Sequence, residues 1–263
     1  MQHHTHALNK ILPLWASCAL PQGIALLPTR KQMIEHPRSV VVAAFPYLLP
    51  EEHYAGRNIA RFAVGRDYHQ AVGERLEQAC ALLREEYPGE EFAHYCDHSP
   101  LPEVALAEHA GLGYRGRHNL LITEQYGSWV VLGEIVTSAA LPIMQPAALR
   151  TNYCDKCPML CVKSCPTGAL SETGFDKLKC LSYRSQRKGD LAPETATHLR
   201  AMHSAWGCDL CQEACVRNKH VRIDPLAEFV QSAVAQLTPH TAIDDRAYVW
   251  RGREILNRNI ENL

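Results

Sequence analysis

The sequence lacks a charge excess of either sign, and it lacks a long apolar run. Its 263 residues carry 27 Lys and Arg against 28 Asp and Glu, for a net charge of −1. This balance gives no overall attraction for nucleic acid, although the basic run at 184–188 can be read either as a local patch or as a solvated loop. No stretch reaches about 18 apolar residues without a charge or a break, so we expect no membrane span and no membrane partner.

The apolar stretch at 11–20 also lacks the features of a secretory signal. The only lysine before it is Lys10, and Pro13 interrupts it. A signal peptide instead has a basic segment followed by an unbroken apolar one. Because a chain whose many cysteines are free thiols suits a reducing compartment, we expect a cytoplasmic protein.

Cysteine, in contrast, is abundant, and eight of the eleven cysteines form a pattern. The pattern is Cys154-x2-Cys157-x3-Cys161-x3-Cys165-Pro166, then Cys180 alone, then Cys208-x2-Cys211-x3-Cys215. A 4Fe–4S cluster takes four thiolates, and in two-cluster ferredoxins the last cysteine of each run binds the other cluster. The pattern therefore predicts two 4Fe–4S clusters. The expected ligands are Cys154, Cys157, Cys161 and Cys215 for one cluster, and Cys165, Cys180, Cys208 and Cys211 for the other.

Two other interpretations of the cysteines explain less. A zinc ribbon also uses paired Cys-x2-Cys units, but zinc held by the pairs at 154/157 and 208/211 leaves the other four cysteines without a role. A disulfide framework is typical of small secreted domains and not of a chain of 263 residues. The three residues between Cys157 and Cys161 depart from the simplest bacterial run, which has about two there.

The apolar pattern predicts an α/β domain followed by two smaller parts. Residues 39–48 are a continuous β-branched and apolar run, which is typical of a buried strand. Asp67 precedes a helical periodicity that begins at Tyr68 and ends near 87–89. The other expected elements are a strand at 92–96, a helix at 102–110, and strands at 119–123 and 128–137. With a boundary in the Pro-rich tract at 141–146, we expect an α/β domain over 1–145, a ferredoxin-like two-cluster module over 146–222 and a short helical tail over 223–263.

Residues 111–116 spell G-x-G-x-x-G, but their context argues against a dinucleotide site. That fingerprint needs a strand before the glycines and a helix after them. Here a predicted helix precedes them and a predicted strand follows. Glycines in such a turn let the backbone approach a bulky neighbour, which is either a ligand or another element of the chain.

Six segments, taken in order over residues 38–220, carry a resemblance to a known family. They are Arg61-Phe-Ala-Val-Gly-Arg-Asp-Tyr-His69, Asp97-His-Ser-Pro-Leu-Pro-Glu103, residues 110–122, residues 127–135, Cys180-Leu-Ser-Tyr183 and residues 207–215. Together they resemble the epoxyqueuosine reductases, which use cobalamin and two 4Fe–4S clusters to remove an epoxide oxygen in the last step of making the tRNA base queuosine. The resemblance implies an oxidoreductase with these cofactors, tRNA as substrate and an external electron donor of flavodoxin or ferredoxin type.

The resemblance also implies a role for each segment. Asp97 matches the carboxylate that protonates the departing oxygen, and a carboxyl group needs a raised pKa to donate near neutral pH. Arg61, Tyr68 and His69 match the substrate side of the cavity. The residues that match the segments around the corrin ring are Gly111, Gly113, Gly116, Arg117, His118, Asn119, Ser128 and Glu134.

Each of these residues also has a structural interpretation. Asp97 stands where helix N-caps and turn residues are common, and Glu103 fits a charge in the first turn of a helix. The chain departs from the family as well. Val216 follows the last cysteine where the family has a proline, and the segments outside residues 38–220, which help to hold tRNA in the family, are short here.

Two other functions therefore stay open. In one, the same cofactors act on another small epoxide, on an organohalide or on a corrinoid itself, an alternative that the near-neutral charge and the short terminal segments favour. In the other, the chain is an electron carrier that binds no corrin. The retained segments at 97–103, 111–119 and 127–134 argue against a carrier, because a carrier does not need them.

Overall fold

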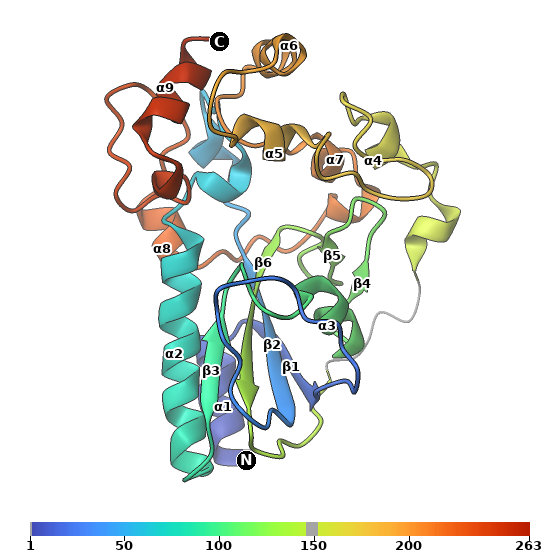
Figure 1. Cartoon of the computed structure of the whole chain (residues 1–263), viewed down its shortest axis with the longest axis vertical. Helices are drawn as coiled ribbons and strands as arrows, with labels where there is room; N and C mark the ends of the chain where they lie inside the picture. Colours follow the sequence, from blue (N-terminus) through green and yellow to red (C-terminus); the bar gives the residue numbers. More distant parts are fainter. Residues whose placement is uncertain (1, 146–151) are drawn as a thin grey trace.

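In the computed structural model, which describes residues 2–145 and 152–263, a four-stranded sheet forms the centre of the first domain (Figure 1). Its strands, in spatial order, are β1 (Leu14–Ala19), β2 (Ser39–Pro46), β6 (Val130–Thr137) and β3 (Phe92–Tyr95). All three pairings are antiparallel, and Glu134 of β6 lies between Val42 of β2 and Tyr95 of β3. Pro146, the last residue of the tract where we predict the domain boundary, lies outside the described residues.

Helices cover both faces of this sheet. On one face, α1 (Gln2–Ile11) and α2 (Tyr68–Glu86) pack over Val41, Ala43 and Phe45 of β2. On the other, α3 (Glu103–His109) packs over Val40 and Val42. Because both faces of β2 are buried, its sequence is a continuous apolar run instead of an alternating one.

The long helix α2 begins and ends where the periodicity predicts. The side chain of Asp67 accepts a hydrogen bond of 3.0 Å from the backbone N–H of His69, so the predicted N-cap is confirmed. Opposite the helix, β6 has a glycine at the point of closest approach. A Cβ at Gly133 would lie 2.8 Å from Leu76 and 2.9 Å from Val72, so a larger residue does not fit there without a shift.

Two predicted elements differ in detail from the structure. The strand predicted at 119–123 is reduced to β5 (Leu121–Ile122), which pairs with β4 (Tyr114–Arg115) as a short hairpin. Because α3 precedes the glycine motif and β4 lies within it, the argument from context against a dinucleotide site is confirmed. The apolar stretch at 11–20 forms β1, an element that was not predicted.

The cysteine-bearing module lies above the sheet in Figure 1, with the C-terminal segments beside it. The module contains η3 (Tyr153–Lys156), α4 (Leu160–Lys163), α5 (Leu181–Ser185), α6 (Pro193–Ala201), α7 (Leu210–Glu213) and η4 (Val216–Asn218). The tail contains α8 (Ala227–Gln231), η5 (Val249–Arg251) and α9 (Arg253–Ile260), and two short turns of the first domain are η1 (Glu51–Tyr54) and η2 (Arg61–Ala63). No helix in the described ranges is long and apolar enough to cross a membrane.

One hydrophobic core joins all three predicted parts. Trp206 of the module and Tyr248 of the tail are fully buried, with ring centroids 5.7 Å apart. Both belong to the same buried cluster as Phe45 of β2. Phe229 of α8 packs so closely on Gly65 that a Cβ there would lie 2.9 Å from it. The tail therefore packs as part of the fold.

Candidate active site

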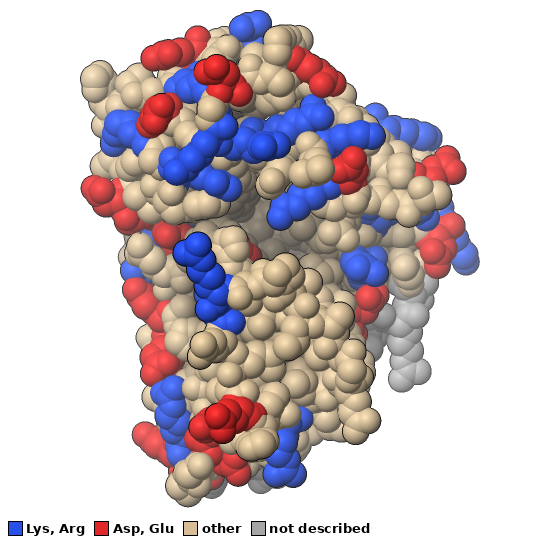
Figure 2. All heavy atoms as spheres, in the orientation of Figure 1, with Lys and Arg blue, Asp and Glu red and all other residues tan. Residues whose placement is uncertain are grey.

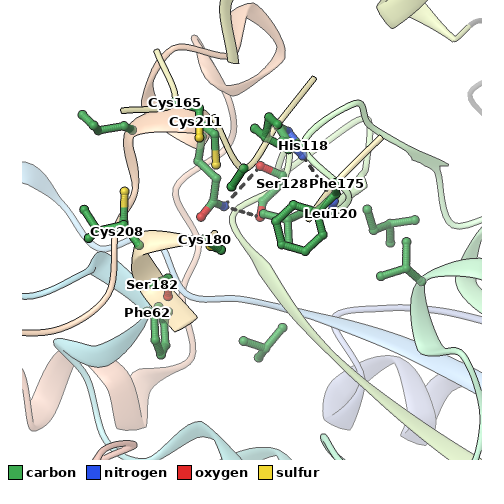
Figure 3. Close-up of a pocket in the computed structure, with 18 of the residues that line it drawn as sticks. Phe62, His118, Leu120, Ser128, Cys165, Phe175, Cys180, Ser182, Cys208 and Cys211 are labelled. Atoms are coloured by element: carbon green, nitrogen blue, oxygen red, sulfur yellow. Dashed lines mark hydrogen bonds between the residues drawn. The ribbon is translucent and has the colours of Figure 1, made fainter. Parts of the chain in front are cut away.

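A cavity of about 350 Å³ lies between the sheet and the cysteine-bearing module. Its lining is largely apolar and includes Val130, Val131 and Leu132 of β6. Two sets of chemically reactive side chains also line it. One is the set Cys165, Cys180, Cys208 and Cys211, and the other is the set Tyr68, Asp97 and Glu103. Figure 3 shows these cysteines across the close-up from His118, Leu120 and Phe175. Thiols suited to a redox cluster and a carboxylate thus share one enclosed space.

The structure brings the eight cysteines together as two sets of four. The pKa of the Cys161 thiol is raised by burial and by the nearby Cys215, Cys154 and Cys157. The members of the second set also lie close together. Burial raises the pKa of Cys208 to about 12, and the nearby Asp209, Cys180 and Cys165 contribute to the shift. All eleven cysteines are free thiols. Four thiols in each set are the donors that a 4Fe–4S cluster needs, so the residues fit two clusters.

The two sets differ in their relation to the cavity. The four cysteines of the second set line it, and none of the first set does. We call the sets the inner and the outer cysteines. The outer set contacts the loop before β5, where the backbone N–H of Arg117 donates to Cys154 Sγ at 3.4 Å. The side chain of Arg117 turns away and donates to the Glu172 carbonyl at 2.6 Å.

Asp97 lies at the centre of a hydrogen-bonded network at the cavity wall. The Tyr68 hydroxyl donates to Asp97 Oδ2, and His69 Nε2 lies 3.2 Å from the same oxygen. The other ring nitrogen of His69 lies 2.7 Å from Asp67 Oδ1. An imidazole between two carboxylates donates through both nitrogens when it is protonated. Asp97 is not a helix cap, because Pro102 holds the N-cap position of α3.

The pKa values in this network differ from the sequence expectation. Burial raises the pKa of Asp97, but hydrogen bonds from His69 and Tyr68 outweigh burial and hold it below its usual range. Burial lowers the pKa of His69, but its bonds to Asp67 and Asp97 outweigh burial and raise it to about 9. The expectation of a raised pKa at Asp97 is therefore wrong for this structure. Near neutral pH, the proton of the pair resides on His69.

The Asp97 loop has an unusual backbone that other segments hold in place. Asp97 and His98 have φ of 52° and 50°, in the left-handed region that residues with a side chain seldom adopt. Lys31 Nζ donates to the Asp97 carbonyl at 2.8 Å, and Thr29 Oγ1 donates to the His98 carbonyl at 2.7 Å. The backbone N–H of Asp97 donates to Glu103 Oε1 at 3.0 Å. Contacts from outside the loop therefore compensate its strain.

Glu103 and Glu134 form a pair of acids beside this loop. Burial and the charge of Asp97 raise the pKa of Glu103 to about 7. Burial and then Glu103 raise the pKa of Glu134 well above its ordinary value. Ser99 donates its hydroxyl to Glu134, which is fully buried in β6. Glu103 does begin α3, but it also lines the cavity, a role that its helix position concealed. Its place in the same sequence segment as Asp97 was the available signal.

The residues expected around a corrin ring fall into three groups. His118 and Ser128 line the cavity, whereas Glu134, Arg117 and Asn119 do not. The third group, the glycines, packs against other residues of the protein. A Cβ at Gly113 or Gly116 would lie 2.2 Å or 2.6 Å from Ile122, and one at Gly111 would lie 3.6 Å from Gln145. For Gly113 and Gly116 the bulky neighbour is therefore a strand of the protein.

His118 is the polar side chain that best fits a ligand in the cavity. It is buried, and burial lowers its pKa to about 4, so the ring is neutral. Its Nε2 has no hydrogen-bond partner among the described residues. A buried ring nitrogen without a partner costs free energy unless a bound group satisfies it. With the apolar lining, this orphaned atom fits a large organic cofactor that has polar edges.

Gln212 links the cavity wall to the cysteine-bearing module, and sequence reasoning missed it. Its Nε2 donates to the Ser128 carbonyl at 2.8 Å and to Tyr47 Oη at 2.9 Å. Asn218 adds a bond of 2.7 Å from the backbone N–H of Ser128. Figure 3 shows Ser128 facing this network. Because Gln212 directly follows the inner cysteine Cys211, it fixes the position of that cysteine against the segment that leads into β6.

Arg61 does not line the cavity. Its guanidinium packs 4.1 Å from the ring centroid of Tyr54 and lies 3.4 Å from Glu213. Its backbone N–H donates to Asp209 Oδ2 at 2.7 Å. Of the three residues expected on the substrate side, the structure thus brings Tyr68 and His69 to Asp97 and leaves Arg61 outside.

Comparisons with known proteins identify the parts of the chain. Residues 29–98 match the family described as "Epoxyqueuosine reductase QueG, DUF1730", and residues 153–218 match "4Fe-4S double cluster binding domain". An epoxyqueuosine reductase of Gloeobacter violaceus is 39% identical over 193 residues, which cover 72% of this chain and 59% of that protein. One of Aliivibrio fischeri is 35% identical over 198 residues, which cover 72% and 52%. The chain thus spans about half of the length of these relatives.

Solved structures share the fold. An epoxyqueuosine reductase solved with a tRNA-Tyr epoxyqueuosine-modified stem loop matches with a TM-score of 0.81 at 20% identity, covering 99% of this chain and 80% of that one. A more distant match, with a TM-score of 0.50 at 15% identity, is a reductive dehalogenase whose structure is linked to B12-dependent dehalogenation; it covers 92% and 42%. The double-cluster match agrees with iron–sulfur ligation and not with a zinc ribbon.

Proposed function

Because the chain belongs to the epoxyqueuosine reductase family, we propose that it is a cobalamin- and iron–sulfur-dependent oxidoreductase that removes the epoxide oxygen of epoxyqueuosine in tRNA. One observation carries this proposal: a single cavity is lined both by the inner cysteines and by Asp97 with its proton network. The overall change adds two electrons and two protons to the epoxide and releases water, leaving an alkene. The inner cysteines supply the route for electrons, and Asp97 supplies the route for a proton.

His118 and Ser128 are the residues that we propose to hold the cofactor. Both line the cavity. Because His118 Nδ1 accepts from the backbone N–H of Leu120 at 3.3 Å, the proton of this neutral ring is on the unpartnered Nε2, which offers an N–H donor to a polar edge of the cofactor. The apolar side chains of β6 provide a dry wall for a flat macrocycle. When bound, cobalamin supplies low-valent cobalt that reduces the carbon–oxygen bond. The protein contributes orientation, water exclusion and protons.

Asp97 and His69 act together as the proton source in this proposal. Asp97 lines the cavity as a carboxylate, and His69 Nε2 holds a proton 3.2 Å from its Oδ2. As charge develops on the departing oxygen, the proton moves from His69 Nε2 to Asp97 Oδ2 and on to that oxygen. Tyr68 holds Asp97 in place through its hydroxyl. Tyr68 is thus a positioning group of the substrate side, and His69 is the proton donor behind Asp97.

A tRNA substrate is supported by the surface above the cavity. Figure 2 shows a hollow between the sheet domain and the module, with a band of Lys and Arg side chains along its upper rim. Phosphate groups are attracted to such a band even when the whole protein is nearly neutral. The solved relative with an epoxyqueuosine-modified stem loop has the same fold. We also place the protein in the cytoplasm, where tRNA and reduced thiols occur.

The test is anaerobic reconstitution followed by turnover. The protein is loaded with iron and sulfide, titrated with hydroxocobalamin, and mixed with an epoxyqueuosine-modified stem loop and a chemical reductant. We expect about eight irons and one cobalamin per chain, and conversion that falls at least about 100-fold in Asp97→Asn.

Each contrary outcome has a different meaning. If both cofactors bind but the stem loop is not converted, the substrate is not epoxyqueuosine in tRNA, and a small epoxide or an organohalide becomes the next candidate. Failure to bind cobalamin would leave an electron carrier, and zinc in place of iron would overturn the cluster assignment.

A further inference from the structure

The outer cysteines have a surface position that suggests how electrons enter. The inner set lines the cavity and the outer set does not. Cys154, Cys157 and Cys215 are partly exposed and Cys161 is buried. The four inner cysteines are partly exposed as well, but they line the cavity. Two electrons are consumed for each epoxide reduced, so the clusters must be reduced again from outside the protein in every turnover. If both clusters form, an electron from the surface reaches the outer cluster first and the cavity last.

We propose that the surface around the outer cysteines, formed by residues 152–163 and 215–222, is the docking site for a small acidic electron-carrier protein. The proposal rests on the cluster assignment in the proposed function but not on its substrate. In each transfer a flavin or iron–sulfur centre of the carrier loses one electron, and the outer cluster gains it, passing from the 2+ to the 1+ state. No proton or bond is exchanged in this step.

Apolar side chains form the first part of the argument. Tyr153 directly precedes Cys154 and is 44% exposed, and Val216 directly follows Cys215 and is 43% exposed. Arg217 lies with its guanidinium 4.5 Å from the ring centroid of Tyr153, so the two cysteine-bearing segments meet at this surface. Exposed apolar groups beside a redox centre suit a short-lived protein contact, because docking there excludes water.

Charge is the second part of the argument. The two segments contain five Lys or Arg and one Asp, although the whole chain has a net charge of −1. Lys156, Lys163 and Lys219 are exposed, and no ion pair joins them to a carboxylate of the described residues. Arg217 and Arg222 do pair, with Glu124 and Asp224. The unpaired lysines leave a positive surface that attracts an acidic partner.

A second entrance to the clusters is less suited to such a partner. A cavity of about 240 Å³ reaches the inner Cys208 from another side. Its one arginine, Arg57, is bound to Asp209 at 2.7 Å and to Glu213 at 2.9 Å. The positive charge there is compensated within the protein, so this opening offers no comparable attraction.

The experiment follows reduction of the clusters in the reconstituted full chain. Reduced flavodoxin, a small acidic flavoprotein, is mixed with the protein, and bleaching of the cluster absorbance is followed by stopped flow. The variant is Lys156→Glu with Lys219→Glu. Lys10→Glu, on α1, controls for the effect of reversing a charge far from the clusters. We expect the second-order rate constant to fall about tenfold in the double variant at low salt, and the difference to vanish at about 0.5 M salt.

Two controls separate docking from damage to the clusters. Dithionite and the cationic dye methyl viologen should reduce the double variant as completely as the unchanged protein, because neither needs an acidic-protein site. Equal rates with flavodoxin for the double variant and the unchanged protein would overturn the proposal and direct attention to the opening at Cys208. Neither readout requires cobalamin or tRNA, so failure here is distinct from failure of the proposed reaction.

Discussion

At the scale of single residues, the His69–Asp97 pair determines how the reaction responds to pH. The pKa of His69 is raised to about 9, and that of Asp97 is lowered, so the pair keeps its proton through neutral pH. We expect the rate of epoxide removal to fall as the pH rises through about 9, because His69 then loses the proton. A single-turnover pH–rate profile measures this. His69→Gln should lose the descending limb, and a profile that stays flat to pH 10 would contradict the assignment.

The same shift predicts a pH-dependent stability. A His whose folded pKa is raised above its unfolded value stabilises the fold below about 6.5, and this contribution is lost as the pH rises through about 9. His69→Gln should therefore lower the thermal midpoint clearly at pH 6 and only slightly at pH 10. A destabilisation of equal size at both values would show that packing, and not charge, is what the ring contributes.

Glu134 should behave as a neutral acid. Burial and Glu103 raise its pKa well above the ordinary value, which favours the neutral acid, and an amide resembles that form. We expect Glu134→Gln to change the free energy of unfolding at pH 7 by less than about 1 kcal/mol, because the bond from Ser99 can persist. Glu134→Lys should be strongly destabilising by comparison. A loss of several kcal/mol in the Gln variant would mean that the ionised form is the native one.

Sequence reasoning at this scale found the residues whose chemistry is local. Asp97, Tyr68 and His69 stand in recognisable segments, and the structure brings all three together. It did not find Gln212, because an amide beside a cysteine has no distinctive pattern. The direction of the Asp97 pKa was also missed. It depends on which side chains surround the carboxylate, and that is decided by tertiary packing.

At the scale of elements, periodicity predicted the buried strand β2 and the helix α2 well, because each has a face or a pair of faces that packing must cover. The strand β1 was missed, since Pro13 and the short length of the apolar run conceal it. The strand order β1-β2-β6-β3 could not be predicted from the sequence, because β6 pairs with β2 and β3 through contacts between residues far apart in the chain. No local pattern encodes such a pairing.

The C-terminal helix α9 holds two segments of the cysteine-bearing module together through one buried side chain. Asn259 is fully buried, and its Nδ2 donates to the carbonyls of Ser185 and Ala205 at 2.9 Å and 2.7 Å. We expect Asn259→Ala to cost about 3 kcal/mol, because both carbonyls lose a buried donor. The measurement is the thermal midpoint of the reconstituted protein. Asn262→Ala is the matched control. Asn262 lies just beyond the end of α9, and its amide donates to the Arg258 carbonyl and to no part of the module in the described ranges. Equal effects of the two variants would contradict this role of Asn259.

At the scale of the whole molecule, the inner and outer cysteine sets should be separable by mutation. Cys180→Ala removes an inner ligand and Cys157→Ala an outer one, so each should reduce the iron content from about eight to about four per chain. We expect cobalamin affinity to fall only in Cys180→Ala, because Cys157 does not line the cavity. Cys80→Ala is the control, since that thiol lies on the buried face of α2, in the core of the first domain. Loss of all iron in either variant would contradict two independent sites.

The shared core has a consequence for inheritance. Trp206, Phe229 and Tyr248 come from the module and the tail, yet they complete the core that begins at Phe45 in the sheet. A gene fragment that encodes only the sheet would leave that core open to water, and one that encodes only the cysteine segments would have little core of its own. A gene segment that encodes only the cysteine-bearing module would therefore not fold independently after transfer into another protein. The cysteine segments and the cavity that they line can therefore change only together with the core that they share.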